Sequence, residues 1–130
     1  MSTRIKHTII ATAGLFVAFG LTGCEKEAPK TLTYQADIKS ILDQHCVECH
    51  KEGAEGTQKS GLLLDTYAAT MRGTRFGPVV IPGQSINSTL YRLISGQADP
   101  SLRMPHDKAP LPDETINKIK DWIDQGAKEQ

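Results

Sequence analysis

The pentapeptide at residues 46–50 (CVECH) constrains this chain of 130 residues more than any other feature. Two thiols separated by two residues and followed at once by an imidazole form the pattern of covalent c-type haem attachment. The spacing allows one turn of chain to present both sulfurs to a porphyrin edge and then to direct an imidazole toward the metal. The pattern therefore predicts that Cys46 and Cys49 form thioether bonds to one haem c and that His50 is the proximal iron ligand.

Two other kinds of site also use closely spaced cysteines. A structural zinc site needs about four ligands, and the third cysteine, Cys24, has a different predicted role. A thioredoxin-like redox site requires a βαβ context, whereas no strand-like alternation persists in this sequence over more than a few residues. Haem attachment is the favoured interpretation, with zinc binding and thiol–disulfide exchange as its alternatives.

The N-terminus has the pattern of an export signal. Arg4, Lys6 and His7 precede an uncharged run over residues 9–21, which at ~1.5 Å per residue is too short for a hydrocarbon layer of about 30 Å. The following residues, 21–24 (LTGC), resemble the lipobox of bacterial lipoproteins, which implies a lipid on Cys24 and removal of residues 1–23. An ordinary signal peptide with an incidental cysteine is the alternative.

These features predict three regions: a signal peptide over residues 1–23, a lipidated tether over 24–32 and a cytochrome domain over 33–130. Several acyl chains, at ~0.8 kcal/mol per buried methylene, would hold the mature protein on a membrane. We expect it in the bacterial cell envelope facing the periplasm, with the outer membrane somewhat favoured because Glu25, and not aspartate, follows Cys24.

The charge balance excludes a nucleic-acid partner. The 15 Lys and Arg residues are offset by 15 Asp and Glu residues, so no net positive field is available to replace counterions. No Ser/His/Asp grouping, paired-carboxylate site or phosphate-binding loop is found, and Gly53, Gly56, Gly61 and Gly73 are interpreted as turns. The sequence therefore identifies no small-molecule substrate.

Hydrophobic periodicity predicts a small all-α domain. A first helix begins near the N-cap candidate Thr33 and runs into residues 45–46, and a last helix has Pro112 in its first turn and ends near Gly126. Their apolar stripes lie at 38, 41 and 42 and at 116, 119 and 123, with Trp122 alongside. Two shorter helices are predicted over about 66–72 and 88–95, each stopped by a glycine.

Long loops are expected over residues 51–61, 73–87 and 97–111. So much irregular chain is unusual in a compact domain, and only 5% of the residues are aromatic. We expect the haem to complete the interior by packing against an apolar set made of Leu62, Leu64, Val79, Val80, Ile81, Leu90, Leu93, Ile94 and Leu102. Arg72, Arg75 and Arg103 are candidate partners for its propionates.

In the order of its motifs the sequence resembles class I c-type cytochromes, and more narrowly the planctomycete-type cytochrome c domain. The similarity covers about residues 33–128. Its matching stretches are Asp37-Ile38, Ile41-Leu42, CVECH, Gly61-Leu62 with Leu64, Gly77-Pro78, Ile81-Pro82-Gly83, Ser88-Thr89-Leu90, Met104-Pro105, Trp122-Ile123 and Gly126-Ala127. The resemblance implies an all-α, class I cytochrome c-like fold of four or so short helices, with long loops wrapped around one covalently bound haem.

The resemblance also implies that Met104 is the distal iron ligand, since it lies in a Met-Pro context. Met71 is interpreted as a core side chain, and His45, next to Cys46, does not easily reach the opposite haem face. Two positions depart from the family pattern, Ser85 and His106, each in place of an expected proline. His106 matters more, because it puts a rival ligand two residues after Met104.

Three functions remain open at this point. The first is a membrane-anchored monohaem carrier that passes single electrons to a redox partner protein and is not an enzyme. The second is a haem enzyme, or a site reactive toward peroxide or a small gas, in which Met104 dissociates readily. The third is a docking or sensor subunit in which the haem is structural.

Overall fold

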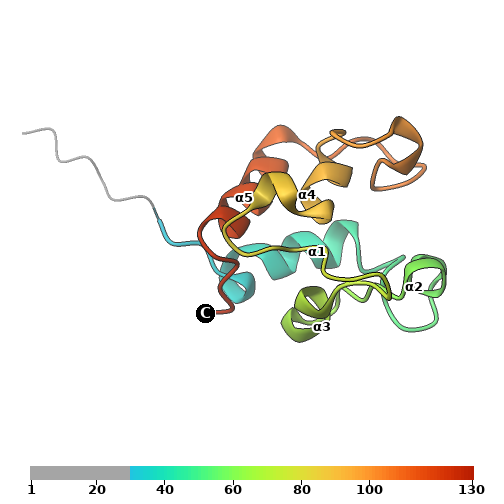
Figure 1. The fold of residues 1–130 in the computed structure, drawn as a ribbon, viewed down its shortest axis with the longest axis horizontal. Helices are drawn as coiled ribbons and strands as arrows, with labels where there is room; N and C mark the ends of the chain where they lie inside the picture. The colour runs from blue at the N-terminus through green and yellow to red at the C-terminus, as the bar shows by residue number, and fades with distance from the viewer. Residues whose placement is uncertain (1–29) are drawn as a thin grey trace, which may run out of the picture.

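The computed structural model describes residues 30–130. Within this range the fold is all-α: short helices are joined by long loops, and the only β pairing is an isolated bridge between Thr74 and Gly77 (Figure 1). This confirms the predicted fold class. No helix within residues 30–130 has the length and apolar character needed to cross a membrane. The predicted signal peptide, Cys24 and most of the tether lie outside the described residues.

The first helical segment begins where the sequence predicts. A π-helical turn, η1 (Tyr34–Ile38), continues into α1 (Lys39–His45). The Thr33 side chain caps η1 by accepting a hydrogen bond from the backbone N–H of Ala36 at 3.3 Å, which satisfies one of the free donors at the helix start. Because α1 ends at His45, it delivers the chain directly into residues 46–50.

The remaining predicted helices also form. Helix α3 (Tyr67–Arg72) is capped by Thr66 and ends at Gly73, α4 (Thr89–Ile94) follows Ser88, and α5 (Asp113–Asp124) follows Pro112. Gly73 has a φ of 81°, and a side chain there would collide with the carbonyl oxygen of Gly77. Only glycine therefore fits this stop. Two single 3₁₀ turns, η2 (Ser85–Asn87) and η3 (Pro100–Leu102), lie in the loops.

One predicted loop is wrong. Residues 51–61 contain a further helix, α2 (Glu55–Ser60). It has no apolar stripe. Its support is local: an ion pair joins Lys59 to Glu55 one turn earlier, and the cap residue Gly61 has a left-handed φ of 79°. Gly56, interpreted as a turn from sequence, is a helical residue of α2.

The core lies where α5 packs against η1. Its centre consists of fully buried side chains from the two predicted stripes and from their neighbours, namely Tyr34, Ile38, Leu42, Ile119, Trp122 and Ile123. The Tyr34 ring packs edge-on against Tyr67, with ring centroids 5.4 Å apart, and the Trp122 indole N–H donates to the carbonyl of Lys128 at 2.9 Å. The core thus joins the two ends of the domain, and Leu62 and Leu64 extend it to the segment that follows residues 46–50.

Candidate functional site

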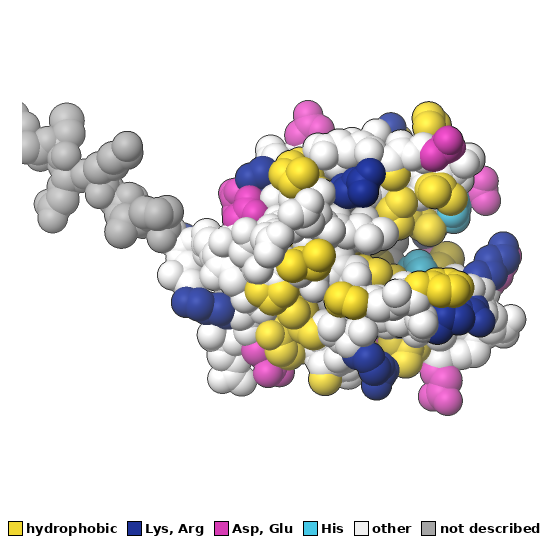
Figure 2. Space-filling view, viewed as in Figure 1, with side chains coloured by type: hydrophobic (Ala, Val, Ile, Leu, Met, Phe, Trp, Pro, Cys, Tyr) yellow, Lys and Arg dark blue, Asp and Glu magenta, His cyan; other side chains and the backbone are white. Residues whose placement is uncertain are grey.

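A single cavity of about 390 Å³ brings the predicted site residues together. Cys46, Cys49, His50 and Met104 all line it, although 54 positions separate His50 from Met104 in the chain. Figure 2 shows a hollow at the end of the molecule remote from the first described residues, with histidine surface inside it. The volume is in the range of cofactor and ligand pockets.

His50 is held in an orientation suited to a metal ligand. Its side chain is buried, with 9% of the residue exposed, and its Nδ1 lies 3.4 Å from the carbonyl oxygen of Leu62. Burial lowers the pKa of His50, which outweighs the opposing effect of that carbonyl. A neutral imidazole that donates one N–H to a backbone carbonyl leaves its second nitrogen free for a metal.

Gly56 of α2 lies against the same imidazole. A Cβ at this position would come within 2.9 Å of His50 Cε1 and 2.7 Å of the Cys49 carbonyl oxygen. That carbonyl also accepts a hydrogen bond from the backbone N–H of Thr57 at 3.1 Å. The α2 backbone thus cradles the C-x-x-C-H segment closely. Sequence analysis missed this contact, because a glycine has no side chain through which periodicity could reveal it.

The two thiols differ in environment. Cys46 is half-buried against the core, whereas Cys49 is exposed, and both are free. Burial is the main cause that raises the pKa of the Cys46 thiol to about 11, with the nearby Cys49 adding to the shift. Redox-active dithiols have the opposite property, a lowered pKa. The raised pKa of Cys46 therefore argues against a thioredoxin-like centre.

Met104 reaches the cavity from the loop after α4. Its backbone N–H donates to the carbonyl of Leu93 at 3.2 Å, and its half-buried side chain packs against the core. Met71, in contrast, packs against the core from α3 and does not line the cavity. The prediction that Met71 is a core side chain is confirmed, and the ligand role of Met104 stays a prediction.

Most of the predicted apolar lining is correct. Six of the nine residues line the cavity: Leu62, Leu64, Val79, Leu90, Leu93 and Ile94. Val80 is instead buried in the protein core, and Ile81 is half-buried outside the cavity. The prediction that Leu102 belongs to this lining is wrong, because Leu102 lies in η3 and is 52% exposed.

Two thiols, imidazoles and a thioether among apolar side chains are the residue types that would hold a covalent haem. None of Arg72, Arg75 and Arg103 lines the cavity, so the predicted propionate partners are not brought to its wall. Arg75 is used elsewhere, since its guanidinium donates to the Gln58 and Lys59 carbonyls at the end of α2.

The part of the chain that the structure describes provides no ligand set for the zinc alternative. Among residues 30–130, no three His, Cys, Asp or Glu side chains come together in a group that could hold a metal ion. Structural zinc sites are almost always four-coordinate. The cavity wall instead carries two thiols, the thioether of Met104 and the imidazoles of His45, His50 and His106.

Comparison with known families supports the same interpretation. A family model described as Planctomycete cytochrome C matches residues 46–108. The match begins at the first cysteine of the pentapeptide and includes His50 and Met104. Neither the curated proteins nor the solved structures contain a match.

Proposed function

This chain carries a planctomycete-type cytochrome c domain, and from that premise we propose that it is a one-electron carrier with a single covalent haem c. Cytochrome c domains are in general haem-based electron-transfer modules. The observation that carries the proposal is the cavity itself, which gathers the C-x-x-C-H segment and Met104 from distant parts of the chain. The electron would be exchanged with a redox partner protein.

In this proposal each site residue has one task. Cys46 and Cys49 form the thioether bonds, His50 supplies the proximal nitrogen and Met104 supplies the distal sulfur. Haem, when bound, supplies the one-electron couple of its iron. The Leu62 carbonyl orients the His50 ring, the Leu93 carbonyl holds the backbone of Met104, and the apolar wall excludes water. A thioether favours ferrous iron, so His/Met ligation raises the reduction potential relative to bis-histidine ligation.

The location is also a proposal. A lipid on Cys24 would anchor the protein to a membrane of the bacterial envelope, with the domain facing the periplasm. The first described residues support this arrangement, because they lie at the end of the molecule opposite α2 and the Met104 loop (Figure 1). An anchor that precedes them would leave the cavity directed away from the lipid surface.

Intact mass spectrometry tests the cofactor and the anchor together. The full chain is expressed in a host with cytochrome c maturation machinery, beside a Cys24→Ser variant and a Cys46→Ser/Cys49→Ser variant. We expect one haem and the acyl groups on the wild type, haem alone on the first variant, and acyl groups alone on the second. A colourless wild-type protein with both thiols free would refute the electron-carrier proposal.

Absorption spectra test the distal ligand. Replacing Met104 with alanine should abolish the methionine-to-ferric-iron charge-transfer band of the oxidised protein. Met71→Ala is the matched control, because this second methionine lies in α3 outside the cavity. Persistence of the band in the Met104→Ala protein, or its loss in the Met71→Ala protein, would contradict the assignment.

A further inference from the structure

The imidazole of His106 lines the same cavity as His50 and Met104. It follows Met104 by two residues, so both side chains come from the same short loop. The electron-carrier proposal gives His106 no task. Imidazole is nevertheless a good ligand for haem iron.

The loop around His106 leaves this side chain uncommitted. His106 is exposed, and among residues 30–130 its imidazole has no hydrogen-bond partner. The last fixed point before His106 is the bond from Met104 N–H to the Leu93 carbonyl, at 3.2 Å. The next attachment is an exposed ion pair between Lys108 and Glu48, and such pairs hold a loop only weakly.

His106 and His50 both line this cavity. A third imidazole, His45, lines the cavity as well, but it is the last residue of α1 and directly precedes Cys46. His45 therefore belongs to the side of the cavity that carries the thiols.

We infer that His106 is a second distal ligand, which takes the iron when Met104 leaves it. This inference rests on the proposed function. In the exchange the iron–sulfur bond to Met104 breaks and an iron–nitrogen bond to His106 forms. The neutral imidazole brings its own lone pair, so the iron keeps its oxidation state. The iron stays six-coordinate, and its reduction potential falls toward that of a bis-histidine centre.

The experiment compares haem-loaded full-length variants at one neutral pH. Met104→Ala should remain low-spin in the ferric state, have a lower reduction potential than the wild type and fail to bind carbon monoxide when reduced. Met104→Ala/His106→Ala should become high-spin and bind carbon monoxide readily. Met104→Ala/His45→Ala, which removes the other unassigned imidazole of the cavity, should behave as Met104→Ala alone. Met104→Leu provides a second background that keeps the apolar bulk.

The outcomes separate this inference from the proposed function. High-spin, carbon-monoxide-binding spectra in both Met104→Ala and Met104→Leu, unchanged by removal of His106, would overturn the inference but leave the electron carrier intact. Loss of the low-spin state on removing His45, and not on removing His106, would overturn it as well. A wild-type protein without attached haem would refute the proposed function, and the inference with it.

Discussion

Replacing Gly56 with alanine tests whether α2 positions the proximal imidazole. In an ordinary exposed helix this change stabilises the protein by up to about 1 kcal/mol. Here the new Cβ would lie 2.7 Å from the Cys49 carbonyl oxygen and 2.9 Å from His50 Cε1. Neither neighbour moves freely, because the carbonyl accepts from Thr57 N–H and the imidazole lies against the Leu62 carbonyl. Crowding of this kind costs about 1–3 kcal/mol.

The opposing effects leave a net destabilisation of roughly 1 kcal/mol. Denaturant unfolding of the haem-loaded protein measures it, and absorption spectra report the expected displacement of the His50 ring. Gln58→Ala is the control, since Gln58 is exposed on the same short helix. A Gly56→Ala protein at least as stable as the wild type, with an unchanged spectrum, would show that α2 does not constrain His50.

Two further predictions concern stability. Leu42 is fully buried, whereas Leu102 is 52% exposed. In denaturant unfolding, Leu42→Ala should lower the free energy of unfolding by about 2–5 kcal/mol and Leu102→Ala by less than about 0.5 kcal/mol. Similar losses in the two variants would contradict the burial pattern. The hydrogen bond from Lys30 is the main cause that lowers the pKa of Asp37, and the backbone N–H of Thr33 adds to it. Because the pKa of Asp37 is lower in the folded protein than in the unfolded protein, where it is about 4, the ionised carboxylate stabilises the fold above pH 4. This contribution is lost as the pH falls through the pKa of the folded protein. Asp37→Asn should therefore lower the free energy of unfolding by about 1 kcal/mol at pH 7. It should also make the free energy of unfolding fall less steeply between pH 5 and pH 2. A pH profile as steep as that of the wild type would refute this assignment.

The sequence predicted those helices that carry their own signals. Caps and apolar stripes located the first helical segment and α5, and the glycines that stop them located α3 and α4. Helix α2 gives no such signal. Its backbone packs closely against the C-x-x-C-H segment at Gly56, where a side chain would not fit. From sequence alone, this glycine is typical of a turn.

The sequence predicted those site residues that lie together in one short motif. The cysteines and His50 follow from one pentapeptide, whereas Met104 required a resemblance, and only the fold brings it to the same cavity. Leu102 shows the limit of hydrophobicity alone. In a loop, no hydrophobic periodicity indicates whether a leucine side chain faces the interior or the solvent. Leu102 lies in η3 and is exposed.

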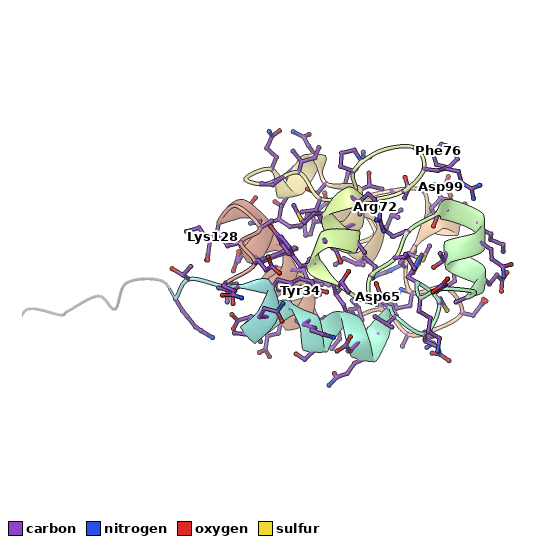
Figure 3. All side chains as sticks on the ribbon, turned by 90° about the horizontal axis from the view of Figure 1, so that it is seen from below. Tyr34, Asp65, Arg72, Phe76, Asp99 and Lys128 are labelled. Carbon is purple, nitrogen blue, oxygen red and sulfur yellow. The ribbon has the colours of Figure 1, made fainter. Side chains whose placement is uncertain are left out.

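The pairing of the two ends of the domain has a practical consequence. The backbone N–H groups of Tyr34 and Gln35 donate to the carbonyls of Lys128 and Glu129, at 2.9 and 3.1 Å. In Figure 3 Lys128 lies at one end of the molecule and the solvent-exposed Phe76 toward the other. An affinity tag or gold-binding peptide fused after Gln130 would therefore mount the protein with its hollow pointing outward. Voltammetry on such a film would address every molecule from the same side.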